Sequence, residues 1–242
     1  MGSVTSPRTG LLLCSLPRVG SSLLGELLYS TGVVGYAGEW FLYPERERLW
    51  QEWRVSSHDD YLDRVLARGT AANGVFATKL MWGHLGEFLL YARRASGDFA
   101  SNDLTVIEAL LPRPRFAWLR RRDTVAQAVS WAKAVQTGQW RAGFAEVREA
   151  AYDFGQIDWI VHQIRVWDGA WTRWFETQGV APEVIWYEDL SANPLKVVDQ
   201  VLAYLELETP AGAAIKPPPD LRKQADGVNA QWIARYLADS SR

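Results

Sequence analysis

Short apolar runs alternate with apolar residues at helical spacing along the chain. The first run covers residues 11–13, and further runs follow at 74–80, 115–119 and 184–187. Such runs are typical of strands buried in a parallel sheet, whereas apolar residues three or four positions apart predict helices. Helices are expected at residues 23–28, 59–68, 84–94, from 124 onward, at 144–178, at 194–204 and at 230–238.

Strands that alternate with helices predict an α/β fold in which a mostly parallel central sheet is flanked by helices. In such sheets ligands bind beyond the carboxyl ends of the strands. Charged residues stand at or just after the end of each predicted strand, namely Arg18, Lys79, Arg121 and Glu188. We therefore expect these four side chains to gather at one edge of the sheet.

The composition allows one well-packed domain. With 242 residues, of which 48% are hydrophobic, residues 1–242 are expected to form a single domain with residues 1–8 as a loose N-terminal tail. A net charge of −2 does not favour nucleic acid as a partner. The single cysteine, Cys14, excludes an internal disulfide. Without a signal-like segment or an apolar stretch of membrane-spanning length, we expect a cytoplasmic protein with no membrane insertion.

The stretch from residue 11 to residue 28 combines the first predicted strand, a loop and the first predicted helix. Its loop contains Arg18 and Gly20, and Ser21 and Ser22 follow directly before the helix. At such a junction the free N–H groups and the positive end of the helix dipole attract an anion, and a glycine lets that anion approach the backbone. The stretch predicts a phosphate or sulfate cradle, although Gly and Ser also occur in such turns as plain helix caps.

The loop differs from the Walker A motif of ATP- and GTP-hydrolysing proteins. That motif places a Lys directly before a Ser or Thr, and here Gly20 stands before Ser21. The missing Lys argues against a P-loop-type small-molecule kinase, which would also need an acidic Mg²⁺ ligand.

Five short motifs are spread from the first predicted strand to the last predicted helix. They are Ser15-x-x-Arg18-x-Gly20-Ser21-Ser22-Leu23-Leu24, Gly35-x-x-Gly38-Glu39-Trp40-Phe41, Lys79-Leu80-Met81-Trp82, Arg121 with Gln127-Ala128-Val129-Ser130, and Lys223-Gln224-Ala225-Asp226 with Trp232 and Arg235-Tyr236. In this order they resemble the motifs of sulfotransferases that use 3′-phosphoadenosine 5′-phosphosulfate (PAPS), in particular the bacterial trehalose 2-sulfotransferase (Stf-type) family.

The resemblance implies a P-loop-like sulfotransferase fold and transfer of a sulfuryl group from PAPS to a hydroxyl of a carbohydrate or glycosylated small metabolite. By their places in the motifs, Glu39 would be the general base and Arg18 would stabilise the leaving phosphate. Donor binding would involve Arg18, Val19, Gly20, Ser21 and Ser22 at the 5′-phosphosulfate and Arg121, Ser130 and Lys223 at the 3′-phosphate. The resemblance implies no metal, and it is compatible with a homodimer.

Several of these residues also fit simpler roles. Arg121 stands between Arg120 and Arg122, and the sequence does not decide which of the three would hold the 3′-phosphate. Glu39 also suits a Gly-rich turn without any chemistry. Lys79 also suits the edge of a sheet, with a buried stem and a charge that reaches solvent.

The chain departs from the family motifs at two places near the expected substrates. Val19 stands where the family commonly has Ser, and Tyr36 stands where it has an acid. Because Tyr36 lies in the segment expected beside the acceptor, the sequence predicts the donor and the reaction type but leaves the acceptor open, trehalose included. A P-loop-type kinase and a non-catalytic nucleotide- or sugar-binding protein of the same fold are the alternatives.

Overall fold

The computed structural model describes residues 6–140, 148–210, 215 and 227–241, and a parallel sheet lies at its centre. The four strands of this sheet lie in the order β2-β1-β3-β4. They are β1 (Thr9–Ser15), β2 (Val75–Met81), β3 (Pro114–Arg120) and β4 (Glu183–Trp186). All neighbouring strands run parallel, which confirms the predicted α/β fold and its parallel central sheet.

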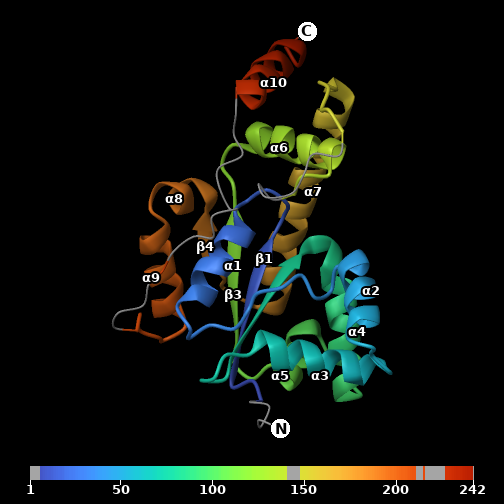
Figure 1. Cartoon of the computed structure of the whole chain (residues 1–242), viewed down its shortest axis with the longest axis vertical. Coiled ribbons are helices and arrows are strands. Elements are labelled where there is room, and N and C mark those ends of the chain that lie inside the picture. The colour runs from blue at the N-terminus through green and yellow to red at the C-terminus, as the bar shows by residue number, and fades with distance from the viewer. Residues whose placement is uncertain (1–5, 141–147, 211–214, 216–226, 242) are drawn as a thin grey trace.

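Helices cover both faces of the sheet (Figure 1). They are α1 (Ser21–Ser30), α2 (Tyr43–Glu52), α3 (His58–Gly69), α4 (Leu85–Ser96), α5 (Asp103–Leu110), α6 (Thr124–Thr137), α7 (Phe154–Gln178), α8 (Tyr187–Ala192), α9 (Pro194–Tyr204) and α10 (Gly227–Asp239), with a 3₁₀ helix η1 (Trp82–His84) between β2 and α4. Helices α1, α8 and α9 pack on one face, whereas α4 and α7 pack on the other.

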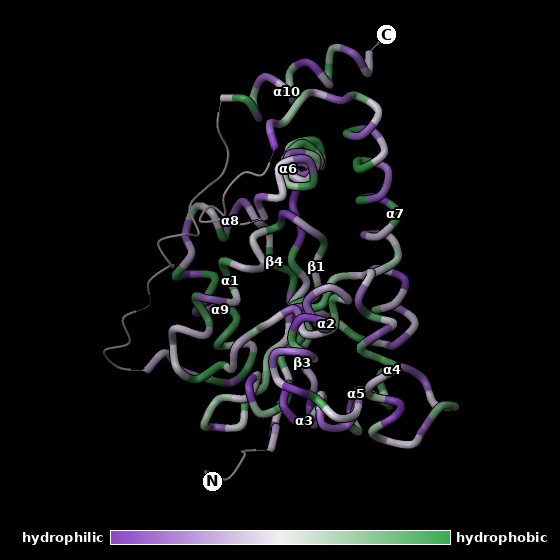
Figure 2. Tube along the Cα trace, turned by 45° about the vertical axis from the view of Figure 1, so that its right-hand side comes forward, coloured by the Kyte–Doolittle hydropathy of each residue, from purple (hydrophilic) through white to green (hydrophobic). Residues whose placement is uncertain are grey.

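Strand β1 divides the core, because successive side chains of a strand point to opposite faces of the sheet. Leu11 and Leu13 pack with α1 and α9, whereas Leu12 and Cys14 pack with α4 and α7. All four side chains are fully buried, and burial raises the pKa of the Cys14 thiol. Hydrophobic and hydrophilic positions alternate along the surrounding helices, as expected of helices with one face in the core (Figure 2).

The predicted helix at residues 144–178 is wrong at its beginning. Helix α7 begins at Phe154, residues 148–153 are not helical, and residues 144–147 lie outside the described residues. Asp153 explains the start, because its side chain accepts the backbone N–H of Gln156 at 2.9 Å as an N-cap. Further along α7, Trp171 and Trp174 are buried in the core.

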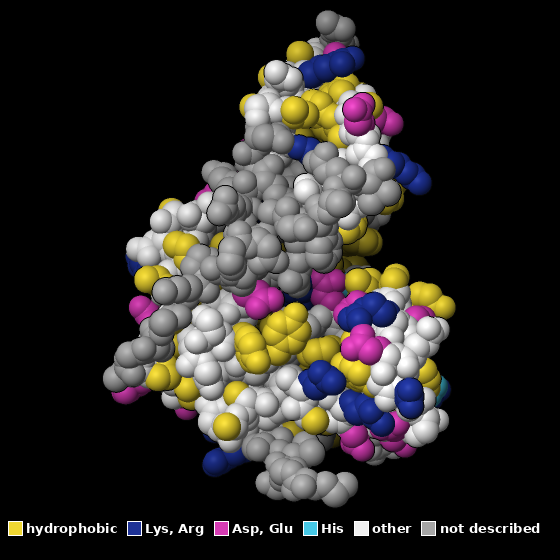
Figure 3. Space-filling view, in the orientation of Figure 1, with side chains coloured by type: hydrophobic (Ala, Val, Ile, Leu, Met, Phe, Trp, Pro, Cys, Tyr) yellow, Lys and Arg dark blue, Asp and Glu magenta, His cyan; other side chains and the backbone are white. Residues whose placement is uncertain are grey.

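The apolar pattern does not predict three short helices, α2, α5 and α8. Helix α2 buries only Leu49, and Arg48 pairs with Glu45 at 2.7 Å on its outer face. Charged side chains of both signs gather over this helix (Figure 3). The signals for α2 and α5 are local, because α2 has a Pro in its first turn and the side chain of Asn102 caps α5.

The two ends of the chain are described in part. Residues 1–5 of the predicted tail lie outside the described residues. Arg8, the last residue of that tail, donates its backbone N–H to the Gly74 carbonyl at 2.8 Å. Within the described ranges, no helix is long and apolar enough to cross a membrane.

Candidate active site

The loop after β1 lies at the carboxyl edge of the sheet and leads into α1. Two of its residues have a left-handed backbone, Arg18 with φ 68° and Gly20 with φ 81°. A Cβ atom at Gly20 would lie 3.0 Å from Leu190 and 3.1 Å from Tyr187, so conformation and space both require glycine. Gly20 is the N-cap of α1 and supplies no side-chain acceptor. The first-turn N–H groups of α1 are thus placed to bind an anion.

Arg18 reaches from this loop to α6, which lies across the carboxyl edge of the sheet (Figure 1). Its Nε donates to Ser130 Oγ at 2.9 Å, and its Nη1 donates to the Trp140 carbonyl at 2.8 Å. Gln127 on α6 fixes the loop by donating to the Pro17 carbonyl at 2.8 Å. The motifs place Arg18 and Ser130 at different phosphates of the donor, whereas the structure brings the two side chains into direct contact.

Arg121, which follows β3, lies beside Arg18. Its Nη1 donates to the Arg18 backbone carbonyl at 3.3 Å, and its guanidinium lies 4.4 Å from the centre of the Tyr187 ring. Burial lowers the pKa of Arg18, and the charge of Arg121 lowers it further. Burial also lowers the pKa of Arg121. Two partly buried cations side by side favour the binding of an anion next to them.

The three consecutive arginines at the end of β3 have different surroundings. Arg120 forms an ion pair with Asp168, and Arg122 forms one with Asp189 at 2.9 Å. Arg121 forms no ion pair within the described residues, and its buried Nε has no hydrogen-bond partner there. Of the three, Arg121 is therefore the arginine that faces the loop with capacity to bind an anion.

Glu39 and Lys79 form an ion pair on the other side of β1. Lys79 Nζ lies 2.5 Å from Glu39 Oε1 and donates to Ser22 Oγ in the first turn of α1 at 2.8 Å. The backbone supports this pair, because the Lys79 N–H donates to the Gly38 carbonyl at 2.9 Å. Only 4% of the Lys79 side chain is exposed, against 24% for Glu39. The alternative in which the Lys79 charge reaches solvent is therefore wrong.

Lys79 is the member of this group that the sequence placed at the ligand-binding edge of the sheet without giving it a role in binding or catalysis. The signal was present, since a Lys within an otherwise apolar strand must find a counter-charge once it is buried. What the sequence could not show was the partner, because Glu39 lies in an irregular segment that meets β2 through backbone contacts of Gly35 and Gly38 and not as a regular strand.

His84 lies near the same ion pair, at the end of η1. Burial lowers the pKa of its imidazole, and the charge of Glu39 acts in the opposite direction. Its Nδ1 is buried without a hydrogen-bond partner among the described residues. A neutral imidazole in this position is a second candidate for a proton acceptor.

The remaining predicted donor residues differ in what they can offer. The Val19 side chain packs in the core with α1 and α9, so it offers a ligand only its backbone. Ser21 is buried in the first turn of α1. Lys223 lies outside the described residues. The described part of the chain holds no group of three His, Cys, Asp or Glu side chains suited to a metal ion.

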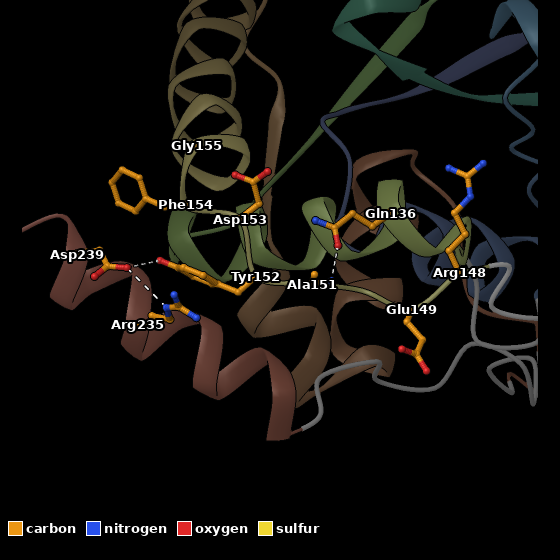
Figure 4. Close-up of a pocket in the computed structure, with 10 residues that line it drawn as sticks. All are labelled: Gln136, Arg148, Glu149, Ala151, Tyr152, Asp153, Phe154, Gly155, Arg235 and Asp239. Atoms are coloured by element: carbon orange, nitrogen blue, oxygen red, sulfur yellow. Dashed lines mark hydrogen bonds and ion pairs between the residues drawn. The ribbon is translucent and has the colours of Figure 1, made fainter.

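A pocket of about 650 Å³ lies away from this loop, between the end of α6, the start of α7 and α10 (Figure 4). At its wall the Tyr152 hydroxyl donates to Asp239 at 3.0 Å, and Arg235 lies 4.1 Å from the Tyr152 ring centre. Nearby, Trp232 and Tyr236 are buried in the core. These two motif residues thus attach α10 to the body of the protein, and neither lines the pocket.

Comparisons with known proteins show the family of this chain. The sequence model of the Stf0 sulphotransferase family matches residues 10–239. A trehalose 2-sulfotransferase from Mycolicibacterium smegmatis is 30% identical, over 97% of this chain and 96% of that protein. One from Mycobacterium tuberculosis is 30% identical, over 96% of this chain and 95% of that protein.

A solved structure supports the fold. The sulfotransferase from Alicyclobacillus acidocaldarius superimposes with a TM-score of 0.52 and 17% identity, over 99% of this chain and 97% of that one. The resemblance drawn from the five motifs is therefore confirmed, together with the P-loop-like sulfotransferase fold that it implies. From the family match over nearly its whole length, the chain belongs to the Stf0 sulfotransferase family.

Proposed function

We propose that this sulfotransferase moves a sulfuryl group from PAPS to a hydroxyl of a carbohydrate or a glycosylated small metabolite. One observation carries the proposal. The candidate base Glu39 is linked through Lys79 to Ser22, at the same helix N-terminus that the Arg18 loop leads into. A proton acceptor and an anion cradle thus adjoin each other, as the attack of a hydroxyl on a sulfuryl group requires.

The cationic side of the site fits a donor with a phosphate at each end of its ribose. Arg18 and the backbone of residues 19–22 are suited to the 5′-phosphosulfate. Arg121, rather than Arg120 or Arg122, is suited to the 3′-phosphate, because its buried Nε lacks a partner in the described residues. Ser130 can assist either arginine from α6, and Lys223 completes the proposed set of 3′-phosphate ligands.

Two side chains carry the proposed chemistry. Glu39 accepts the proton of the acceptor hydroxyl while the oxygen of that hydroxyl forms a bond to sulfur. The bond between sulfur and the bridging oxygen breaks, and its electron pair leaves with the phosphate, whose charge Arg18 stabilises. General-base help of this kind contributes about 10²–10⁴ in rate, and one oxyanion-type donor contributes about 10²–10³.

The acceptor is proposed from the relatives and from the surroundings of Glu39. Both curated relatives are trehalose 2-sulfotransferases. In this chain Tyr36 packs edge-on between Tyr29 and Trp40, at 5.4 and 5.6 Å between ring centres. Tyr36 in place of the family's acid replaces a charged carboxylate by an aromatic ring with a neutral hydroxyl, and this favours a glycoside with an apolar part over trehalose itself.

A turnover assay tests the proposal. The protein is incubated with PAPS, without added metal, and with trehalose, other sugars and glycosylated metabolites in turn, and sulfated products are identified by mass. We expect a product that gains one sulfuryl group, together with adenosine 3′,5′-bisphosphate. Tight donor binding without product from any hydroxyl acceptor would favour the non-catalytic binding protein instead, and ATP-dependent phosphorylation would favour the kinase.

A further inference from the structure

Lys79 contacts both the candidate base, Glu39, and the helix N-terminus proposed to hold the sulfuryl group. Its ammonium lies 2.5 Å from the Glu39 carboxylate and 2.8 Å from the Ser22 hydroxyl in the first turn of α1. Under the proposed function, on which this inference rests, Glu39 receives the acceptor's proton and the N-terminus of α1 holds the sulfuryl group. Lys79 therefore stands between the base and the group to be transferred.

The pairing with Lys79 works against the proposed role of Glu39. A cation in contact with a carboxylate stabilises its ionised form and opposes its protonation. During the transfer, however, the acceptor oxygen bonds to sulfur, the leaving phosphate departs with an electron pair, and the acceptor's proton must pass to Glu39. A carboxylate that stays paired with Lys79 is a weak base at that moment.

The burial of Lys79 makes protonation of Glu39 still less favourable. Only 4% of the Lys79 side chain is exposed, and Glu39 is the one carboxylate in the described residues that pairs with it. When Glu39 takes up a proton and becomes neutral, the buried ammonium loses its counter-charge, which is costly. An ammonium has three donors and can turn to another anion. The contact with Ser22 already directs Lys79 Nζ toward the N-terminus of α1.

The backbone limits this movement to the end of the side chain. Lys79 is paired with Leu13 in the sheet, and its N–H donates to the Gly38 carbonyl at 2.9 Å. The same Gly38 forms a bridge to Thr78, which holds the Glu39 segment against β2. A rotation of the Lys79 side chain can therefore separate the ammonium from Glu39 without moving β2 or the segment that carries Glu39.

We propose that Lys79 exchanges partners in the reaction, from the Glu39 carboxylate to the oxygens of the sulfuryl group bound at the N-terminus of α1. Because of the exchange, the charge of Lys79 no longer opposes protonation of Glu39 once the sulfuryl group is in place. It also supplies the buried ammonium with a counter-charge while Glu39 is neutral. Because it contacts the transferred group, Lys79 is a catalytic residue in addition to its contact with the base.

Equilibrium binding of PAPS by calorimetry, without an acceptor, tests the exchange independently of turnover. Glu39→Gln keeps the shape of the side chain but removes its charge, so Lys79 no longer has to leave a carboxylate to meet the donor. We expect this variant to bind PAPS at least about fivefold more tightly than the native protein, the lower end of ordinary coupling between two sites. In a Lys79→Met background the same Glu39→Gln change should lose most of this gain.

The double-mutant comparison separates the exchange from simpler effects. Equal tightening in both backgrounds would mean that Glu39 merely repels the donor, and it would overturn the proposal, as would no tightening in the native background. Glu108→Gln, on the exposed face of α5, controls for the loss of a distant charge. Lys79→Gln replaces Lys79→Met if the latter does not fold. A native protein that binds no PAPS would instead refute the proposed function itself.

Discussion

The two sides of the candidate site hold positive charge in different ways. Beside β2, the Lys79 ammonium already has a carboxylate partner, Glu39, at 2.5 Å. Beside β3, Arg121 donates to the backbone carbonyl of Arg18 and forms no ion pair in the described residues, although the charges of Asp123 and Glu188 oppose the lowering of its pKa by burial. A cation that meets neutral acceptors keeps its charge for a ligand, whereas a cation paired with a carboxylate must first be released. The β3 side is therefore suited to steady phosphate binding and the β2 side to the chemical step.

The largest expected effect lies on the β2 side. Glu39→Gln should lower kcat by about 10²–10⁴, because the acceptor's proton loses its acceptor. Donor binding should not weaken, since the β3 side is unchanged and the partner exchange of Lys79 tightens it, and Glu108→Gln on the surface of α5 should behave as the native protein does. A Glu39→Gln rate close to native would remove Glu39 from the mechanism and make His84 the next base to test.

Arg18 should give the next largest effect. Arg18→Met removes the charge that stabilises the leaving phosphate, and we expect kcat with saturating PAPS to fall by about 10²–10³. The matched control is Arg173→Met, since Arg173 is exposed on α7. If Arg18→Met weakened PAPS binding but left kcat intact, Arg18 would hold the donor without taking part in the chemical step.

Arg121, on the β3 side, is tested through donor binding alone. Arg121→Ala should weaken PAPS binding about 10- to 100-fold, the range for loss of hydrogen bonds to a charged group. Arg122→Ala, which breaks the exposed contact with Asp189, should have little effect on binding. Adenosine 5′-phosphosulfate, which lacks the 3′-phosphate, serves as the second ligand. An equal loss of affinity for both ligands would refute the assignment of Arg121 to the 3′-phosphate.

The smallest expected effect concerns Ser130, which meets Arg18 at 2.9 Å. Ser130→Ala removes one hydrogen bond worth about 1 kcal/mol, so the dissociation constant of adenosine 3′,5′-bisphosphate should rise about fivefold. Ser130→Thr keeps the hydroxyl and should restore most of the affinity. Loss of affinity in both variants alike would show that packing of α6, rather than the hydroxyl, is what matters.

The sequence predicted those parts of the fold that depend on continuous burial. Strands β1 and β2 and the second half of β3 are buried apolar runs, whereas β4 at the edge of the sheet buries only Ile185. Helix α9 and the loop before α1 carry strong local signals. Helix α2 is missed because only Leu49 on it is buried, with Trp50 partly buried beside it, and most of its other residues are charged. The start of α7 is misplaced because the apolar pattern does not register the cap at Asp153.

The sequence indicated most of the residues that the structure brings together at this edge of the sheet, but it did not indicate how they pair. Motif spacing indicates Arg18, Glu39, Arg121 and Ser130, since each follows a strand or lies in a motif. The choice of Arg121 among three arginines depends on Asp168 and Asp189, which come from α7 and α8, far along the chain. Likewise the contact between Arg18 and Ser130 spans 112 residues and requires α6 to cross the end of the sheet.

The central claim is that the cations beside β1 and β3 bind the two phosphates of a PAPS-type donor without a metal. Calorimetric titration of the native protein with adenosine 3′,5′-bisphosphate, beside ATP and ADP and with and without Mg²⁺, tests it most directly. We expect the bisphosphate to bind more tightly than either nucleotide, with the same affinity in the presence and absence of Mg²⁺. Preference for ATP in the presence of Mg²⁺ would contradict it and favour a kinase.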